Sequence, residues 1–130
     1  MIVVDASAVV ESLLGMPSAP AVEAVMFASH QTLHAPHLVD VEVAQVVRRM
    51  VAHGGVDRER GLAALEQLID LRVHRYPHYA LLPRIWELRN NLTAYDAAYV
   101  ALAEALNAPL LTRDRRLAAA AGHRAKIELV

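Results

Sequence analysis

Short runs of aliphatic and β-branched residues alternate along this chain with segments of helical periodicity, and this alternation restricts the folds that are open to it. The first run, Ile2-Val3-Val4, ends at Asp5 and leads directly into a helical segment. Strands that alternate with helices predict a parallel sheet covered by helices on both faces. We therefore expect an α/β fold with a mostly parallel central sheet, and the 130 residues suit one domain spanning 1–130.

The positions of the strands and helices follow from the apolar pattern and from glycine, proline and capping residues. Strands are expected at residues 2–4, 33–35, 73–76, 109–112 and 127–130. Helices are expected at 6–14, 18–29, 38–51, 79–90, 93–106 and 114–121, together with one that is capped by Asp57 and ends near Leu71. In the helix after Asp57 we expect Leu62, Leu65 and Ile69 to face the core, and we expect helix 79–90 to tolerate or kink at Pro83.

The amino-acid composition excludes some kinds of functional site and argues against others. The chain has no cysteine, which excludes disulfides and cysteine-based zinc sites. Its net charge of -1 argues against binding of nucleic acid by bulk attraction, so any such contact must be local. The basic residues are nearly all arginine, which grips phosphate bidentately, and Lys126 is the only lysine. We expect no signal peptide or membrane span and a cytoplasmic location.

Four acidic residues fall where an α/β sheet gathers functional groups. Asp5 follows the first predicted strand and Asp114 follows the strand at 109–112, while Glu42 and Asp96 lie early in two helices that can face the same crevice. Two carboxylates about 4 Å apart repel by roughly 4 kcal/mol at an effective dielectric near 20, so such a cluster requires a cation. Carboxylate oxygens suit Mg²⁺ or Mn²⁺, which can activate water for phosphodiester hydrolysis.

Each acid also has a purely structural interpretation. Asp5 and Asp114 are placed to cap the helices that follow them. Thr93-Ala94-Tyr95-Asp96 resembles a capping box. Glu42 can be a solvated helix residue, and Asp40 competes with it for any acidic role. Residue order alone leaves both interpretations open for all of these positions.

Four segments around these acids have the residue order of a known family. They are Val3-Val4-Asp5-Ala6-Ser7-Ala8; Glu42-Val43-Ala44 with Arg48-Arg49; Thr93-Ala94-Tyr95-Asp96-Ala97-Ala98-Tyr99-Val100-Ala101-Leu102-Ala103-Glu104; and Leu110-Leu111-Thr112-Arg113-Asp114-Arg115-Arg116-Leu117. Across essentially the whole chain, this order and spacing resemble the PIN-domain ribonucleases and, more narrowly, the VapC toxins of bacterial type II toxin–antitoxin pairs. One departure is Gln45, which stands where this family often has Asn.

The resemblance implies a PIN-like fold and endoribonuclease activity that depends on Mg²⁺ or Mn²⁺. It implies that Asp5, Glu42, Asp96 and Asp114 are catalytic metal ligands, with Asp5 and Asp96 the closest. Ser7 and Thr112 match positions where the family places a hydroxyl beside the acids, although local backbone capping is an equal alternative for them. The resemblance also implies an RNA substrate, homodimerisation, and inhibition by a cognate VapB-type antitoxin whose tail enters the active-site groove.

Other residues carry weaker signals. Asp114 is flanked by three arginines, Arg113, Arg115 and Arg116. At least one of them is expected to contact RNA or the antitoxin. The alternative is that they form a solvated helix start. The seven histidines are dispersed and do not predict a zinc site. Tyr95, Tyr99 and Trp86 are expected in the core or in a dimer interface rather than against bases. The rival function is a non-catalytic binding module of the same fold that acts through a protein partner.

Overall fold

The computed structural model describes all 130 residues, and it confirms the predicted alternation of strands and helices. In chain order the elements are β1 (Ile2–Val4), α1 (Ala6–Leu13), α2 (Ala19–Met26), β2 (Leu33–Pro36), α3 (Leu38–Ala52), α4 (Arg58–Asp70), β3 (Val73–Tyr76), the 3₁₀ turn η1 (Tyr79–Leu81), α5 (Leu82–Glu87), α6 (Ala94–Leu106), β4 (Leu110–Thr112), α7 (Arg115–Ala119) and β5 (Ile127–Leu129).

The five strands form one parallel sheet in the order β3-β2-β1-β4-β5. The chain starts at the central strand, moves outward through β2 and β3, and then returns to place β4 and β5 on the other side of β1. This reversal puts a topological switch point between β1 and β4, and α/β proteins bind ligands beyond the carboxyl ends of the strands at such a point. The residues that follow β1 and β4 therefore face a shared crevice.

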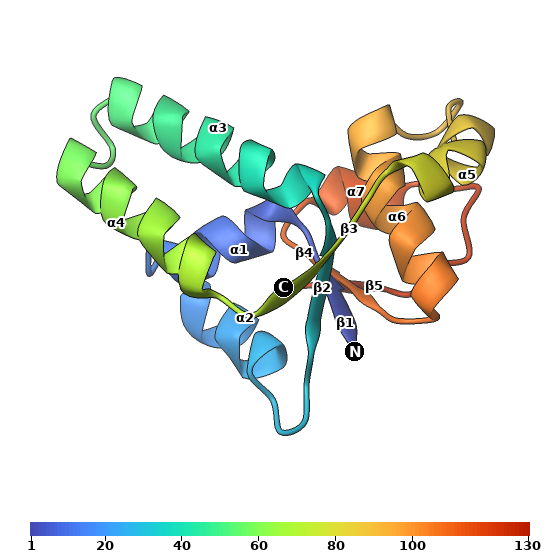
Figure 1. Cartoon of the computed structure of the whole chain (residues 1–130), viewed down its shortest axis with the longest axis horizontal. Helices are drawn as coiled ribbons and strands as arrows, with labels where there is room; N and C mark the ends of the chain where they lie inside the picture. The colour runs from blue at the N-terminus through green and yellow to red at the C-terminus, as the bar shows by residue number, and fades with distance from the viewer.

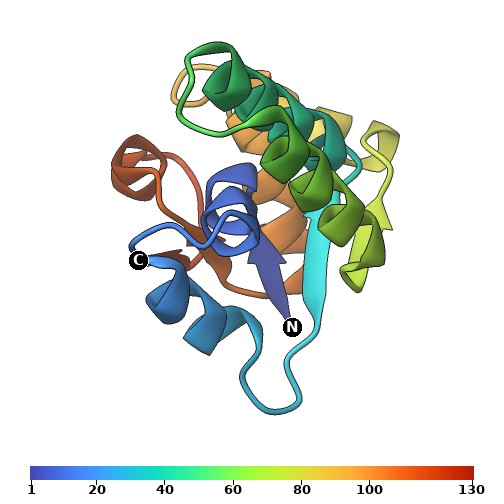
Figure 2. The ribbon, with the colours of Figure 1, turned by 90° about the vertical axis from the view of Figure 1, so that its left-hand side faces the viewer.

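Helices cover both faces of the sheet, as expected for parallel strands. Helices α1 to α4 lie on one side and α5 and α6 on the other (Figure 1), and the view in Figure 2 shows the first group in front of the sheet. The α3–α4 hairpin projects beyond the sheet (Figure 1). None of the helices has the length and apolar character that a membrane span requires.

Helix α6 has the longest run of buried residues in the protein, and its sequence explains why. Every residue from Ala97 to Ala103 is buried, and most of them are alanine. Small side chains let the helix lie close to β1, β2 and β4, which it contacts. The helix ends at Asn107, which adopts a left-handed conformation with φ 49°, and asparagine tolerates this conformation better than most residues. Asp96 is thereby fixed at the N-terminal end of a rigid element.

The predicted inward face of α4 is wrong for two of its three residues. Leu62 and Ile69 are 59% and 78% exposed, whereas Leu65 is partly buried and packs against the core as expected. The fully buried residues of α4 are Gly61, Ala64 and Leu68, whose spacing is the same as that of the predicted set, so helical periodicity could not separate the two. Gly61 decides the outcome, because a Cβ there would lie 2.9 Å from a methyl of Val51 on α3.

The segment 79–90 also differs from its prediction. It begins as the 3₁₀ turn η1 and continues as the six-residue helix α5, with Pro83 in the first turn of α5. Proline lacks an N–H and is preorganised for the first turn of a helix, so it starts a new helix here instead of kinking a longer one. The helix predicted at 18–29 likewise ends early, at Met26, because Phe27 is exposed and offers no buried contact that would extend it.

Candidate active site

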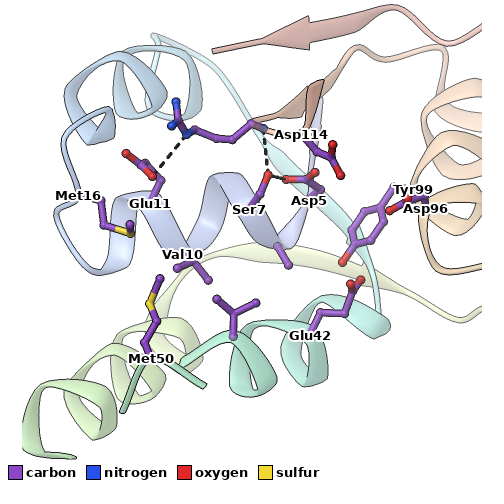
Figure 3. Close-up of a pocket in the computed structure, with 13 residues that line it drawn as sticks. Asp5, Ser7, Val10, Glu11, Met16, Glu42, Met50, Asp96, Tyr99 and Asp114 are labelled. Carbon is purple, nitrogen blue, oxygen red and sulfur yellow. Dashed lines mark hydrogen bonds and ion pairs between the residues drawn. The ribbon is translucent and has the colours of Figure 1, made fainter. Parts of the chain in front are cut away.

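The four predicted acids line one cavity at the carboxyl edge of the sheet. Asp5 directly follows β1, Asp114 lies two residues after β4, Glu42 is in the second turn of α3, and Asp96 is the third residue of α6. The cavity has a volume of about 310 Å³. Figure 3 shows the four side chains around it, reaching in from segments far apart in the sequence. The structure therefore brings together all four residues that the sequence singled out.

Asp5 is buried, and its carboxylate is held by three donors. Oδ1 accepts hydrogen bonds from the Ser7 hydroxyl at 2.6 Å and from the Ala8 backbone N–H at 3.0 Å. Oδ2 accepts a short hydrogen bond from the Thr112 hydroxyl. The bond from Ala8 makes Asp5 the N-cap of α1. The structural and functional interpretations of Asp5 are therefore compatible, because the residue caps a helix and faces the cavity at the same time.

Ser7 and Thr112 join the two loops that carry the site. The Ser7 hydroxyl accepts a hydrogen bond from the backbone N–H of Arg113 at 2.9 Å, and the Thr112 hydroxyl accepts one from that of Asp114 at 2.9 Å. Since both hydroxyls also donate to Asp5, they connect the end of β1 to the end of β4. Thr112 both caps local backbone and contacts an acid, whereas the backbone group that Ser7 binds lies far away in the chain, so for Ser7 only the contact with an acid agrees with the sequence interpretation.

Asp114 and Asp96 are placed by helix starts. Asp114 is the N-cap of α7, where its Oδ1 accepts from the N–H groups of Arg116 at 2.8 Å and Leu117 at 3.4 Å, and its Oδ2 accepts no hydrogen bond. The Thr93 hydroxyl accepts from the Asp96 N–H at 3.2 Å, which is one half of the predicted capping box. The reciprocal bond, in which the Thr93 backbone N–H would donate to the Asp96 carboxylate, is absent. Both acids thus keep free carboxylate oxygens.

Asp40, which competed with Glu42 in the sequence, points elsewhere. Its carboxylate binds the guanidinium of Arg75 on β3 through two hydrogen bonds of 2.7 and 2.8 Å. It does not line the cavity, whereas Glu42 does. The two residues are two positions apart on α3 and therefore face different directions. The structure resolves this alternative in favour of Glu42.

The electrostatics of the cavity favour protonated acids in the absence of a cation. Burial raises the pKa of Asp5, an effect that Ser7 and Thr112 partly offset and that nearby Asp114 reinforces. Burial likewise raises the pKa of Glu42 and of Asp96, and the other carboxylates of the cavity add to both shifts. Mutual repulsion and desolvation therefore act in the same direction, and a bound cation would relieve both.

The donor set fits a hard divalent cation, although it does not enclose one. No three of the chain's His, Cys, Asp or Glu side chains converge tightly enough to hold a metal ion by themselves. Mg²⁺ suits such an open site, because it keeps several waters and takes only one or two carboxylates. The Oε1 atom of Glu42 is buried without any hydrogen-bond partner. A cation, or a water molecule bound to it, can bind such a buried oxygen that lies among other acids and has no partner in the protein.

Glu11 lines the same cavity and was missed in the sequence. It is 5% exposed, accepts a hydrogen bond from the Ser18 N–H at 2.6 Å, and lies 3.4 Å from the Arg113 guanidinium. Arg113 also donates to the carbonyl of Val130 at 2.9 Å. The available signal was an acid one turn after Ser7 in an otherwise apolar helix, which places it on the Ser7 face.

The predicted arginine contacts occupy two kinds of environment. Arg113 lines the cavity and is paired with Glu11. Arg115 and Arg116 are exposed at the start of α7 and do not line the cavity. Tyr99 is buried, as expected, but it also lines the cavity. Tyr95 and Trp86 are exposed on the surface.

Comparison with known proteins identifies the family. The family model described as PIN domain matches residues 2–123. Ribonuclease VapC1 of Mycobacterium tuberculosis is 47% identical over 129 residues, covering 98% of this chain and 96% of the relative. Ribonuclease VapC12 of the same organism is 43% identical over 130 residues, covering 100% of this chain and 99% of the relative.

A solved structure with the same fold is VapBC2 from Rickettsia felis, bound to a DNA fragment from its promoter. The matched chain has a TM-score of 0.72 and 17% sequence identity, and the match covers 100% of this chain and 99% of that one. At this identity the match establishes the fold alone. The family model and the sequence relatives lead to one conclusion: the chain belongs to the PIN domain family and, within it, to the VapC ribonucleases.

Proposed function

We propose that this protein is a divalent-cation-dependent endoribonuclease and the toxin of a VapBC-type toxin–antitoxin pair. The observation that supports this most directly is the convergence of Asp5, Glu42, Asp96 and Asp114 on one cavity. The named activity of the relatives, ribonuclease, agrees with the chemistry of an all-carboxylate site. A cytoplasmic location suits this role, because RNA and an antitoxin are both found there.

Each residue of the site has a defined part in this proposal. Asp5, Glu42, Asp96 and Asp114 would hold Mg²⁺ or Mn²⁺. When bound, such a cation supplies activation of water and neutralisation of charge on the phosphodiester. Ser7 and Thr112 keep the Asp5 carboxylate oriented by donating to its two oxygens. These hydrogen bonds favour the ionised form of Asp5 and so counter the effect of its burial.

The arginines beside Asp114 are proposed to contact RNA or the antitoxin. Arg113 sits in the cavity wall, and Glu11 and the Val130 carbonyl fix its guanidinium there. Arg115 and Arg116 form no ion pair and extend from the start of α7 next to the site. Cations at a helix start oppose the helix dipole, so helix stability does not explain them. Planar guanidinium groups suit phosphate and carboxylate equally well.

The cavity also suits an antitoxin tail. Beside the acids its wall is apolar, with Val10, Met16, Val46 and Met50 contributing. A peptide that carries a basic side chain close to apolar ones would complement both parts of the cavity. Among the solved structures of this fold are a VapBC2 from Rickettsia felis and a VapBC-1 from Haemophilus influenzae. We therefore propose a VapB-type antitoxin as the protein partner.

A second copy of the chain is the proposed occupant of an apolar groove separate from the acid cavity. The groove lies between the start of α3 and helices α5 and α6, and its volume is about 190 Å³. Leu82 and Tyr95 line it and are 55% and 63% exposed, and Trp86 of α5 is 68% exposed. Large apolar side chains exposed this close together are typical of an interface. Homodimerisation would bury them.

Cation-dependent cleavage of RNA tests the proposed function. Protein stripped with EDTA and then dialysed is expected to leave total bacterial RNA intact, and added Mg²⁺ or Mn²⁺ is expected to restore endonucleolytic fragments. The expected ratio of rates is about a thousandfold, because a cation supplies several kcal/mol of charge stabilisation in the transition state. Gel electrophoresis of end-labelled RNA measures it.

The same assay distinguishes a ribonuclease from the rival function, a non-catalytic binding module. Cleavage that continues unchanged in excess chelator would contradict the cation-dependent mechanism. Binding of RNA or antitoxin with no cleavage of any RNA in the presence of either cation would instead indicate a non-catalytic binding module.

A further inference from the structure

The geometry points to Tyr99 as a positioning residue of the active site. We propose that the Tyr99 hydroxyl holds the Glu42 carboxylate in place among the acids by donating a hydrogen bond to it. This inference rests on the function proposed above, since it concerns how one carboxylate is prepared for a cation. Tyr99 touches neither cation nor substrate in this role and acts only through Glu42.

Two unsatisfied polar atoms meet at this point of the cavity. Tyr99 is 1% exposed, yet its hydroxyl has no hydrogen-bond partner. Oε1 of Glu42 is also buried and has no partner. The two side chains come from α6 and α3 on opposite walls of the cavity, and the Tyr99 hydroxyl is directed at the Glu42 carboxylate (Figure 3). A buried donor and a buried acceptor that face each other without partners indicate that the two form a hydrogen bond in the active protein.

Two of the four acids have no donor within ordinary hydrogen-bond distance of their carboxylates. The Asp5 carboxylate is held by Ser7, Ala8 and Thr112, and backbone N–H groups of α7 hold Asp114. The carboxylates of Glu42 and Asp96 have no such donor, and Glu42 is the one that faces Tyr99, which lies close enough to lower the pKa of the Glu42 carboxyl. The Glu42 carboxylate also lies at the end of three rotatable bonds, whereas the Tyr99 ring is fixed in the core. The tyrosine is therefore a rigid donor, and a small rotation of the glutamate completes the contact.

Side-chain packing alone does not explain a tyrosine at position 99. Phenylalanine would fill the same space without placing an unsatisfied hydroxyl in the interior. Asp96 and Tyr99 are three positions apart, which is nearly one helical turn, so the two side chains lie on the same face of α6. The helix that delivers Asp96 to the cavity thus also delivers a hydroxyl group to Glu42. Carboxylates that bind metal ions are commonly oriented by hydrogen bonds of this kind.

The test uses Tyr99→Phe with Tyr79→Phe as its matched control, because Tyr79 is exposed and lines neither the acid cavity nor the apolar groove. The first readout is calorimetric titration of the RNA-free protein with Mn²⁺. We expect Tyr99→Phe to weaken Mn²⁺ binding by about 10-fold or more, within the range found for residues that orient ligands. We also expect kcat for RNA cleavage to fall with KM unchanged. Tyr79→Phe should match the parent in both measurements.

A double-mutant cycle shows whether Tyr99 acts through Glu42. In a Glu42→Gln background, Tyr99→Phe should have little further effect on Mn²⁺ binding. A second measurement leaves Tyr99 intact: the ¹³Cζ NMR signal of Tyr99 in labelled parent protein should shift on Glu42→Gln substitution. This second readout keeps the proposal testable if the Phe variant does not fold.

Several outcomes would overturn the inference. They are parent-like Mn²⁺ affinity and kcat in folded Tyr99→Phe, an undiminished effect of Tyr99→Phe in the Glu42→Gln background, or an unmoved ¹³Cζ signal. Failure of the proposed function looks different, because the parent itself would then neither bind Mn²⁺ in the cavity nor cleave RNA.

Discussion

Replacing Asp5 with Asn is expected to lower the rate of RNA cleavage by about a thousandfold or more while leaving the fold intact. The loss follows from removing one of the carboxylates that balance the charge of a divalent cation, whose contribution is worth several kcal/mol. The fold should survive because the amide oxygen can still accept from Ser7 and Ala8, and the amide NH₂ can donate to the Thr112 hydroxyl in place of the present bond. Single-turnover cleavage of RNA and circular dichroism measure the two effects.

Asp57→Asn is the matched control for this variant. Asp57 also caps a helix, accepting from the Arg60 N–H at 2.7 Å, and it does not line the acid cavity. Asparagine is an equally good N-cap, so this variant should retain both its stability and its activity. Equal cleavage by parent and Asp5→Asn protein would show that the assigned site is wrong. Equal loss in both variants would show that helix capping, and not cation binding, is what the assay detects.

The metal-free protein is expected to lose stability as the pH rises from mildly acid to neutral, and Mn²⁺ is expected to reverse the loss. The pKa values of Asp5, Glu42 and Asp96 are raised in the folded state, first of all by burial. Between the ordinary carboxyl pKa and these raised values the folded protein binds more protons than the unfolded chain. Stability therefore falls with rising pH in this interval.

A bound cation reverses the pH dependence of stability that these acids contribute. Binding requires ionised carboxylates, so stabilisation by Mn²⁺ should grow as the pH rises through the same interval. At a free Mn²⁺ concentration of 100 times Kd it should reach about 2.7 kcal/mol, a rise in Tm on the order of 10 °C for a domain of this size. Thermal unfolding from pH 5 to 8, with EDTA or with Mn²⁺, measures both trends.

The comparison with Asp5→Asn isolates the site from other titrating groups. Glu104, for example, has a lowered pKa because Arg84 holds it, and it therefore stabilises the protein as the pH rises. The difference between the parent and Asp5→Asn curves cancels such contributions. In EDTA, the stability of the parent protein could instead rise towards neutral pH in parallel with that of Asp5→Asn. That result would contradict the burial and mutual repulsion assigned to the acids.

Features set by local sequence could be predicted, and the four acids belong to this class. The alternation of elements fixes a parallel sheet, and parallel strands place Asp5 and Asp114 at the same edge. The capping alternatives were also correct, because Asp5 and Asp114 cap α1 and α7. The sequence could not show that capping uses mainly one carboxylate oxygen of Asp114 and leaves the other free. That distinction depends on atomic geometry.

Features set by contacts between distant segments were not predictable. Gly61 determines the buried face of α4 through its closeness to α3, and the periodicity of the larger residues pointed to the wrong face. Glu11 and Arg113 meet across the cavity although about a hundred positions separate them in the chain. Tyr99 was correctly expected in the core, but the direction of its hydroxyl depends on how α6 and α3 lie against the sheet.

Anomalous X-ray diffraction from crystals grown with MnCl₂ tests the central claim most directly. We expect a manganese peak inside the acid cavity, at about 2.0–2.3 Å from carboxylate oxygens of at least two among Asp5, Glu42, Asp96 and Asp114, with water completing the coordination. Manganese bound only at the protein surface, or held in the cavity by none of these side chains, would contradict it.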